Sequence, residues 1–500
     1  MNARLLKETR ALLPIFACML PLIVVPQLIW PPAGFGYLAL GVACVVMAGS
    51  AFGAEFQHRT ISLLLSQPIP RSVIWREKML VLGVFIVTSL AVLLGCLAVA
   101  PCGNDYQDWL VLVLIPLCAF CGAPFWTLTV RQGIAGMVVA VGAPSGMLAV
   151  YALVTVQLGG STPEALSAAF ISLLLLIYCA VVYWLGYATF KRLEAVDTPA
   201  QELRLPVGLE AIFVAPLTKI SSRFRGSFAT LLKKECRLQQ IGLLLAGVFV
   251  LIAVAGFCLA KRYPEVATGI VGGDIATYAL VLPLIAGAIS VAEEKGWGIA
   301  EWHLSLPPSA LKQWSAKMVA TLSISLVLGL LLPVAVFLVA YPLFNPSGAR
   351  TSLPTAFAVL GWVLGQMLVT SVAVYAASFS KTTLNAILAA LVILIASGGA
   401  LLLAAYWEHH IAHAPMPRIG QSSALAAYTG GSSVVERVVL PLLCAALVCG
   451  LGLFQWLAWV NFRRFGAPVL RLIAQLSVIL LSVWLLAWVL FSALFPPTLN

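Results

Sequence analysis

Residues 80–101 read LVLGVFIVTSLAVLLGCLAVAP and contain no charged side chain. A bilayer core about 30 Å thick is crossed by roughly 20 apolar residues in an α-helix, so this stretch alone predicts a membrane-spanning helix. The whole chain agrees, because 9% of its 500 residues are charged and 62% are apolar, whereas about 25% of the residues in an average soluble protein are charged. A soluble or disordered protein is therefore excluded.

The same criterion, an uncharged apolar run of about 20 residues, predicts thirteen spans. Their approximate limits are 12–30, 35–54, 80–101, 109–130, 133–156, 165–190, 241–260, 272–292, 319–341, 354–379, 384–406, 435–460 and 472–495. The first follows a basic N-terminus, as in a signal peptide, but no small-x-small cleavage site precedes the next span. We therefore expect an all-α, polytopic transmembrane bundle of about 13 spans.

Lys and Arg residues predict the orientation, because they resist translocation across the membrane. If the N-terminus is cytoplasmic, 24 of the 29 basic residues fall in cytoplasmic loops. The other five are Lys261, Arg262, Arg350, Arg418 and Arg437. We expect a cytoplasmic N-terminus and, with an odd number of spans, an external C-terminus. The net charge of +11 is scattered between apolar runs and so does not indicate a nucleic-acid-binding domain.

Two predicted cytoplasmic loops have similar sequences. EFQHRTISLLLSQPIPRSVIWREK runs from Glu55 to Lys78, and EKGWGIAEWHLSLPPSALKQWSAK runs from Glu294 to Lys317. Six of the 24 positions are identical at a constant offset of 239 residues. A shorter pair, KETR and KECR, precedes the first span of each half. The sequence therefore predicts a pseudo-two-fold internal repeat of six-span units.

This repeat divides the chain into four segments. Residues 1–190 form the first six-span unit, 191–240 a cytoplasmic linker, 241–465 the second unit, and 466–500 an additional C-terminal span. The linker ends in a stretch whose apolar and basic residues alternate with helical spacing. It predicts either an amphipathic helix on the inner leaflet or a solvated linker helix.

Each loop predicts a helix that breaks at Ser-x-Pro and restarts into the third span of its half. The breaks are Ser66 to Pro68 and Ser305 to Pro307, with Ser72 and Ser309 as N-caps of the restarted helices. A rigid piece joined to two spans by a proline break would be suited to act as a lever. The alternative is an ordinary turn, because Ser and Pro are common turn residues.

Trp75 and Trp314 follow in the restarted helices. At this place a Trp of the interfacial aromatic belt would anchor the helix. Lys78 and Lys317 would close it on the cytoplasmic side.

The order Glu, Arg-Thr, leucine run, Ser-x-Pro-x-x-Arg and Lys resembles the signature of the permease subunits of ABC-2 type exporters. The first loop carries it at Glu55, Arg59, Thr60, Ser66, Pro68, Arg71 and Lys78. The second carries it at Glu294, Ser305, Pro307 and Lys317, with Gly298 and Ile299 in place of Arg-Thr. The close match covers these two 24-residue stretches, and the six-span layout extends the resemblance over most of the chain.

In that family each six-span unit pairs with another, and the loop between its second and third spans docks on a cytoplasmic ATPase subunit. The resemblance implies that this chain supplies both units and that its loop residues couple to two ATPases. The sequence contains no phosphate-binding loop GxxxxGK[ST]. ATP and Mg²⁺ are therefore expected on the partner, and the chain itself is not expected to be an enzyme.

The implied function is export of an amphipathic, lipid-like or peptide substrate from a prokaryotic cytoplasmic membrane. A secondary transporter or a lipid scramblase built from a tandem repeat is the main alternative. No charge is expected at mid-membrane depth, because Asp274 and Glu293 fall at the ends of predicted spans. This placement disfavours proton-coupled transport.

Polar, uncharged residues occur inside the predicted spans. Gln366, Thr370 and Tyr375 are candidates for substrate contacts, although hydrogen bonding between helices is the commoner role of such residues.

A third alternative, a membrane enzyme, would use the external histidines. His409 and His413 are one helical turn apart, as metal ligands can be. The HExxH order is absent and no third ligand is evident, so we expect no metal.

Overall fold

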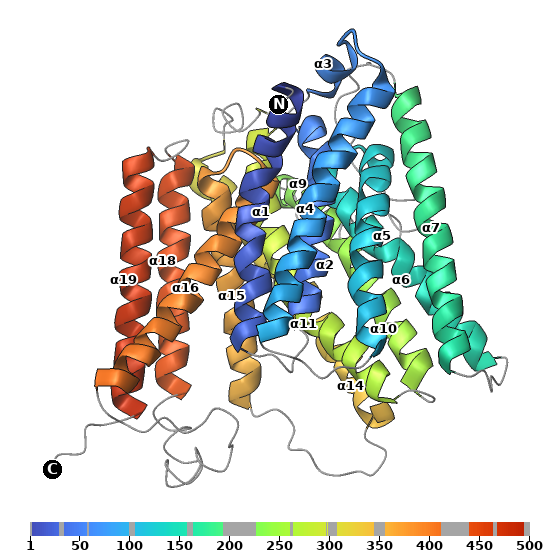
Figure 1. The fold of residues 1–500 in the computed structure, drawn as a ribbon. Coiled ribbons are helices and arrows are strands. Elements are labelled where there is room, and N and C mark those ends of the chain that lie inside the picture. The colour runs from blue at the N-terminus through green and yellow to red at the C-terminus, as the bar shows by residue number, and fades with distance from the viewer. Residues whose placement is uncertain are drawn as a thin grey trace. The chain divides into compact units, whose positions relative to one another are not determined.

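The computed structural model describes residues 3–29, 35–57, 60–99, 106–157, 164–193, 227–260, 264–296, 298, 308–344, 356–411, 440–463 and 468–494. Within these ranges every regular element is a helix (Figure 1). Eleven of the described helices are long and apolar enough to cross a membrane, and two more, α16 and α19, contain shorter apolar stretches. The prediction of a polytopic helical membrane protein is confirmed.

The helices coincide with all thirteen apolar segments of the sequence. Up to residue 296 they are α1 (Ala3–Ile29), α2 (Phe35–Gln57), α3 (Ile61–Leu65), α4 (Arg71–Val99), α5 (Tyr106–Val130), α6 (Gly133–Gln157), α7 (Glu164–Arg192), α9 (Ser227–Leu238), α10 (Gln240–Ala260) and α11 (Pro264–Gly296). The remainder are α13 (Ala310–Leu326), the π-helical segment η2 (Val327–Leu331), α14 (Leu332–Phe344), α15 (Ala356–Phe379), α16 (Thr383–Ile411), α18 (Leu440–Arg463) and α19 (Val469–Leu494). Helix α9 lies where the basic stretch of the linker predicts a helix.

The chain forms two compact units. The first consists of Met1–Leu282 and Leu331–Gly348, and the second of Pro283–Leu330 and Ala349–Asn500. The boundary passes through α11 and through the end of η2.

Helix α2 is the centre of the first unit, where it packs against α1, α4, α5 and α6. Its close approach to α6 depends on two glycines, because a Cβ atom on Gly53 would lie 2.8 Å from the Cα atom of Gly133. Small residues at such a crossing replace side-chain contacts by close backbone packing. Outside this centre, α7 packs on α5 and α10 packs on α6.

Helix α15 is the centre of the second unit and packs against α13, α16 and α18. Gly287 of α11 allows a close approach to α15, because a Cβ atom there would lie 2.6 Å from the backbone oxygen of Thr370. The C-terminal helix α19 packs on α16 and α18. The thirteenth segment is therefore an integral part of this unit.

Asp274 does not lie at the end of a span, and that expectation is wrong. Helix α11 begins at Pro264, a residue favoured in the first turn because it has no N–H group to leave unpaired. The apolar part of α11 begins at Ala267, seven residues before Asp274. At 1.5 Å per residue the carboxyl lies about 10 Å inside this part. The span predicted from the sequence begins at residue 272 and so places Asp274 at its end, whereas the helix is apolar from Ala267 onwards.

Candidate coupling site at the two loop roots

A buried cation joins the end of α2 to the beginning of α4. Lys78 Nζ lies 2.7 Å from Glu8 Oε2 and 3.3 Å from Glu55 Oε1, and it donates a hydrogen bond to the Ala51 carbonyl oxygen at 3.1 Å. Lys7 Nζ lies 3.3 Å from the same Glu55 oxygen. The Lys78 side chain is 2% exposed. We call Ala51, Glu55 and Lys78 the first clamp.

An equivalent cation joins the end of α11 to the beginning of α13. Lys317 Nζ lies 2.8 Å from Glu294 Oε1 and donates to the Ser290 carbonyl oxygen at 3.1 Å. Both charged side chains are 3% exposed. These three residues form the second clamp, and each stands 239 positions after its counterpart in the first. The two loops that resemble each other in sequence therefore have the same ionic contact at their roots.

In the sequence, the charged residues of each clamp are the first and last residues of its loop, and the sequence does not show that they form an ion pair. Removing one partner of a buried ion pair costs about 3–5 kcal/mol, because it leaves an uncompensated charge. Each clamp therefore fixes two helix ends against one another and gives the loop between them a rigid base.

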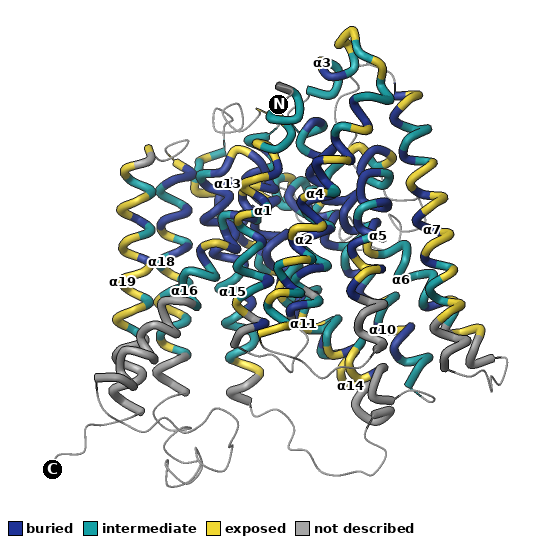
Figure 2. Tube along the Cα trace, viewed as in Figure 1, coloured by how far each residue is buried: buried dark blue, intermediate teal, exposed yellow. Residues whose placement is uncertain are grey.

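The first loop is described from Thr60 onwards. The Thr60 hydroxyl donates to the Glu55 carboxylate, and its backbone N–H donates to the Glu55 carbonyl oxygen at 2.9 Å. Helix α3 follows, with Leu64 buried and Leu63 68% exposed. The turn after α3 is exposed and includes Pro68 (Figure 2). The loop thus has an anchored root and an exposed, partly apolar tip.

Ser72 is not an N-cap, contrary to expectation. Helix α4 begins at Arg71, and the carbonyl oxygen of Pro70 accepts from the N–H groups of Val73 and Ile74 at 2.9 and 3.4 Å. Pro70 can precede the helix because the start of a helix needs no donor from it. In the second loop the prediction is confirmed, because the Ser309 hydroxyl accepts from the Lys312 N–H at 3.4 Å.

Arg71 contacts the end of α7. Its Nη1 atom donates to the carbonyl oxygens of Lys191 and Leu193 at 2.6 and 2.7 Å. The last carbonyl groups of a helix have no partner within the helix, so this guanidinium stabilises the C-terminus of α7. Arg71 therefore ties the beginning of α4 to α7.

Trp75 and Trp314 are buried, so their assignment to an interfacial belt is wrong. The Trp75 ring centroid lies 5.2 Å from that of Phe52 and 5.6 Å from that of Phe190. Trp314 lies 5.2 Å from Phe462. The helix faces that carry these rings point toward α7 and α18 rather than toward lipid, and the sequence of one helix alone cannot show which face is covered.

The final turns of α7 and α18 form a second matched pair of features. Lys191 Nζ lies 4.7 Å from the Tyr187 ring centroid, and Arg463 Cζ lies 5.6 Å from that of Trp459. A cation over an aromatic face at this distance is a favourable contact. The interval between the two pairs is 272 residues.

A sequence signal for this pair exists. The last nine residues up to Arg192 read WLGYATFKR, and those up to Arg464 read WLAWVNFRR. Four of the nine positions are identical. The second stretch lies 272 residues after the first, so it does not share the 239-residue offset of the two loops.

The candidate substrate residues on α15 connect helices. Thr370 Oγ1 lies 2.7 Å from Ser325 Oγ of α13, and Thr370 donates to the Gln366 carbonyl oxygen at 2.8 Å. The Tyr375 hydroxyl donates to Gln475 Oε1 of α19 at 3.0 Å. All three candidates are buried. Their contacts are those of hydrogen bonding between helices, the commoner role of such residues.

Asp274 is a candidate site that the sequence reading missed. Its Oδ2 atom and the hydroxyl of Tyr278, one turn later, have no hydrogen-bond partner among the described residues. The Tyr278 ring stacks on Phe249 with centroids 4.2 Å apart. A carboxyl inside a membrane span is costly and is a functional-site candidate by default.

Several sequence-predicted residues lie outside the described part of the chain. They are Arg59, Ser305, Pro307, Ile299 and His413, together with the side chains of His409 and His410. Among the described residues no group of three His, Cys, Asp or Glu side chains could hold a metal ion.

No protein-family model, curated protein or solved structure matches the chain.

Proposed function

We propose that the chain is the transmembrane subunit of an ATP-driven exporter of the ABC-2 type, which moves an amphipathic, lipid-like or peptide substrate. The observation that carries this proposal is the duplicated clamp at the roots of the two resembling loops. A loop that receives force from an ATPase needs a rigid base and an exposed tip. The first loop has both.

The proposal includes a chain built as two six-span units. Two independent matches support it, the clamp at an interval of 239 residues and the cation over a ring at 272 residues. Each match involves corresponding spans of the two six-span units. The clamps connect spans two and three, and the cation–ring pairs lie at the end of span six. The interval is longer at span six because more residues separate α14 from α15 and α16 from α18 than separate α4 from α5 and α6 from α7.

Mechanical coupling would proceed from the exposed tip to the membrane. Closure of the ATPase pair would push on the apolar surface around Leu63 and Pro68. The first clamp resists rotation of the loop at its root, so the push is delivered to α4. Arg71 then passes it to the C-terminus of α7. No residue of this chain is catalytic in such a mechanism.

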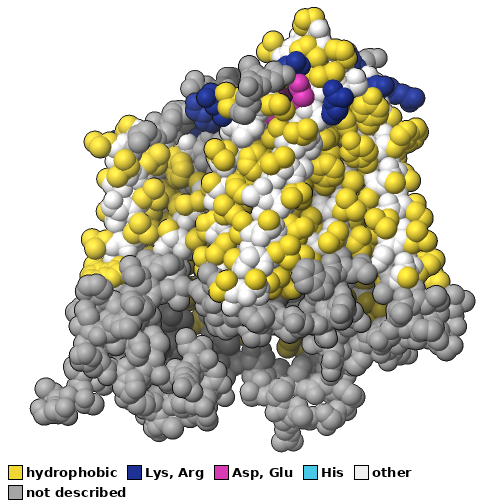
Figure 3. Space-filling model, in the orientation of Figure 1, with side chains coloured by type: hydrophobic (Ala, Val, Ile, Leu, Met, Phe, Trp, Pro, Cys, Tyr) yellow, Lys and Arg dark blue, Asp and Glu magenta, His cyan; other side chains and the backbone are white. Residues whose placement is uncertain are grey.

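A cytoplasmic position of the loop is part of the same proposal. The Lys and Arg side chains seen on the first unit gather at the end from which α3 projects, and apolar side chains cover the surface beyond them (Figure 3). Such a distribution fits a chain inserted with this end inside. With an ATPase partner in the cytoplasm, the prokaryotic inner membrane is the expected location.

Crosslinking tests the docking of the loop. A cysteine placed at exposed Gln67, in a background without reactive cysteines, should crosslink to a co-purified ATPase carrying a Walker motif. Val84→Cys is the matched control. Val84 is also exposed but lies in the middle of α4, away from the loop, so this cysteine should not crosslink. Purification of the intact chain without any ATPase, and transport that does not need ATP, would contradict the proposal.

Asp274 favours a second candidate, a cation- or proton-coupled secondary transporter. In this case uptake or export would follow an imposed ion gradient in vesicles without ATP. Asp274→Asn should abolish that transport, whereas Glu265→Gln, near the start of the same helix, should preserve it. Gradient-independent transport in the unaltered chain would exclude this candidate.

A further inference from the structure

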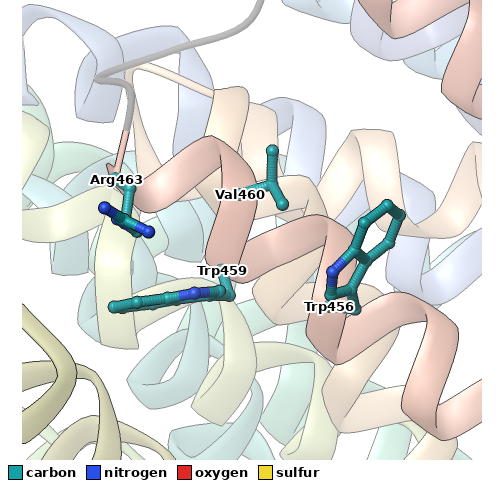
Figure 4. A pocket seen from close by; sticks show the side chains of 4 residues that line it. All are labelled: Trp456, Trp459, Val460 and Arg463. Carbon is teal, nitrogen blue, oxygen red and sulfur yellow. The ribbon is translucent and has the colours of Figure 1, made fainter.

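One face of α18 carries an open pocket near the end of the helix. Trp456, Trp459, Val460 and Arg463 line it, and its volume is about 330 Å³ (Figure 4). Their spacing of three and four residues places these side chains on one side of the helix. Trp456 is 61% exposed. The pocket is therefore open to the outside of the protein near the end of α18.

Arg463 supplies the charge of this pocket. Its guanidinium lies over the Trp459 ring, and it forms no ion pair with a carboxylate in the part of the chain that the structure describes. The Trp459 ring contacts the rings of Trp314 and Phe462, with centroids 5.8 and 6.1 Å away. The pocket thus has a fixed aromatic floor and a cation whose charge is not neutralised by a described acidic residue.

The end of α7 repeats this arrangement. Trp184 is 66% exposed, and Lys191 lies over Tyr187 one turn later. Arg192 follows and is exposed. Neither cation forms an ion pair among the described residues of the first unit. The same combination, an outward Trp followed by a ring under a cation, therefore occurs at both helix ends.

We propose that the ends of α18 and α7 each bind the phosphate group of an anionic phospholipid from the leaflet on the loop side. The aromatic residues lie in the last turns of apolar helices, the part of a span where Trp and Tyr commonly meet headgroups, and in the proposed topology the cations face the inner leaflet, which attracts Lys and Arg. The exposed Trp below each cation offers an apolar surface to the acyl chain. A soluble phosphate would meet the same cation but would gain nothing from this second surface.

The two ends should differ in strength. A guanidinium offers two parallel N–H groups to a phosphate, whereas an ammonium acts as a point charge. We therefore infer that α18, with Arg463, holds its lipid more tightly than α7, with Lys191. This inference does not depend on an ATPase partner.

Native mass spectrometry of the full chain in detergent, with phosphatidylglycerol added, tests the proposal. The unaltered chain should bind two anionic lipids, Arg463→Gln should lower the occupancy of one site, and the Lys191→Gln/Arg463→Gln double variant should lower the occupancy of both. We expect Arg463→Gln to weaken the tighter site about fivefold, which corresponds to about 1 kcal/mol. Arg463→Lys should give an intermediate value.

Arg471→Gln is the matched control, because it removes one positive charge from α19, at the same side in the proposed topology, where no ring contact to this arginine is found among the described residues. It should retain both lipids. Equal retention of phosphatidylcholine would overturn the proposal, as would equal losses in Arg463→Gln and Arg471→Gln. Displacement of the bound lipid by millimolar inorganic phosphate would also overturn it, because the occupant would then be a free anion. Unchanged elution of each variant from a sizing column shows that the variant is folded.

Discussion

The two clamped loop roots share their ion pairs but differ in what lies beyond them. In the first, Arg71 opens α4 and reaches the end of α7, whereas the position 239 residues later is Ala310, which has no polar side chain. In the second, α13 starts from the side-chain cap of Ser309 instead. The shared ion pair fixes the base of each loop, and both third spans pack on the last span through a Trp, but among the described residues only the first adds hydrogen bonds from an Arg to the end of that last span.

The third spans differ as well. Helix α4 runs from Arg71 to Val99 without interruption, whereas the π segment η2 separates α13 from α14. Such segments bend helices and often mark functional positions. A continuous helix transmits a push along its axis, so the first loop should be the stronger lever.

The largest effect should come from breaking the clamps. Lys78→Met and Lys317→Met each remove the buried cation of a clamp, which costs about 3–5 kcal/mol of the free energy of unfolding. The loss should be larger for Lys78, which contacts both Glu8 and Glu55. Thermal unfolding of the detergent-solubilised chain, followed by tryptophan fluorescence, measures it. The exposed Lys312→Met is the control, and an equally large loss there would refute the role of the clamps.

Substitution of Arg71 should have the next largest effect. Arg71→Ala removes two charge-assisted hydrogen bonds to the end of α7 and should cost about 2 kcal/mol. If the first loop is the stronger lever, the transport rate should fall by more than the loss in the free energy of unfolding explains. Arg76→Ala, an exposed position on the same helix, should leave both nearly unchanged. Normal transport by Arg71→Ala would show that the contact with α7 does not carry the push.

The proline break should affect transport with little loss of stability. Pro68→Ala together with Pro70→Ala lets α3 continue toward α4, because a proline inside a helix costs about 3 kcal/mol and its removal lifts that barrier. Either single substitution should have a weaker effect, because one proline remains. Pro307→Ala should likewise do little, since Pro308 remains beside it. Substrate-dependent ATP hydrolysis measures the coupling, and an unchanged rate in the double variant would argue against the lever.

The helix caps should give the smallest difference. Ser309→Ala removes the cap of α13 and should cost about 1 kcal/mol of stability. Ser72→Ala should change stability by less than about 0.5 kcal/mol, because Ser72 lies inside the first turn of α4. Thermal unfolding of the two variants side by side checks this order, and a reversed order would mean that the loop roots differ in another way.

Sequence reasoning predicts the helices well because hydropathy directly reports which segments can cross a membrane. It fails where the outcome depends on neighbours. Trp75 looks like an interfacial residue until α7 is seen to cover it, and Arg71 looks free until the end of α7 is seen beside it. Asp274 was misplaced for another reason, because the predicted span began at residue 272 and left out the apolar residues of the helix before the charge.

The π segment η2 has a consequence for changes in chain length. A π turn accommodates one more residue than an α turn. Deleting one residue within Val327–Leu331 can therefore convert η2 to α-helix without rotating the side chains of α14 about the helix axis. Helix α4 has no such reserve, and a deletion there rotates all later side chains by about 100°. The chain is therefore expected to tolerate a single-residue deletion in one of its two third spans and to reject it in the other.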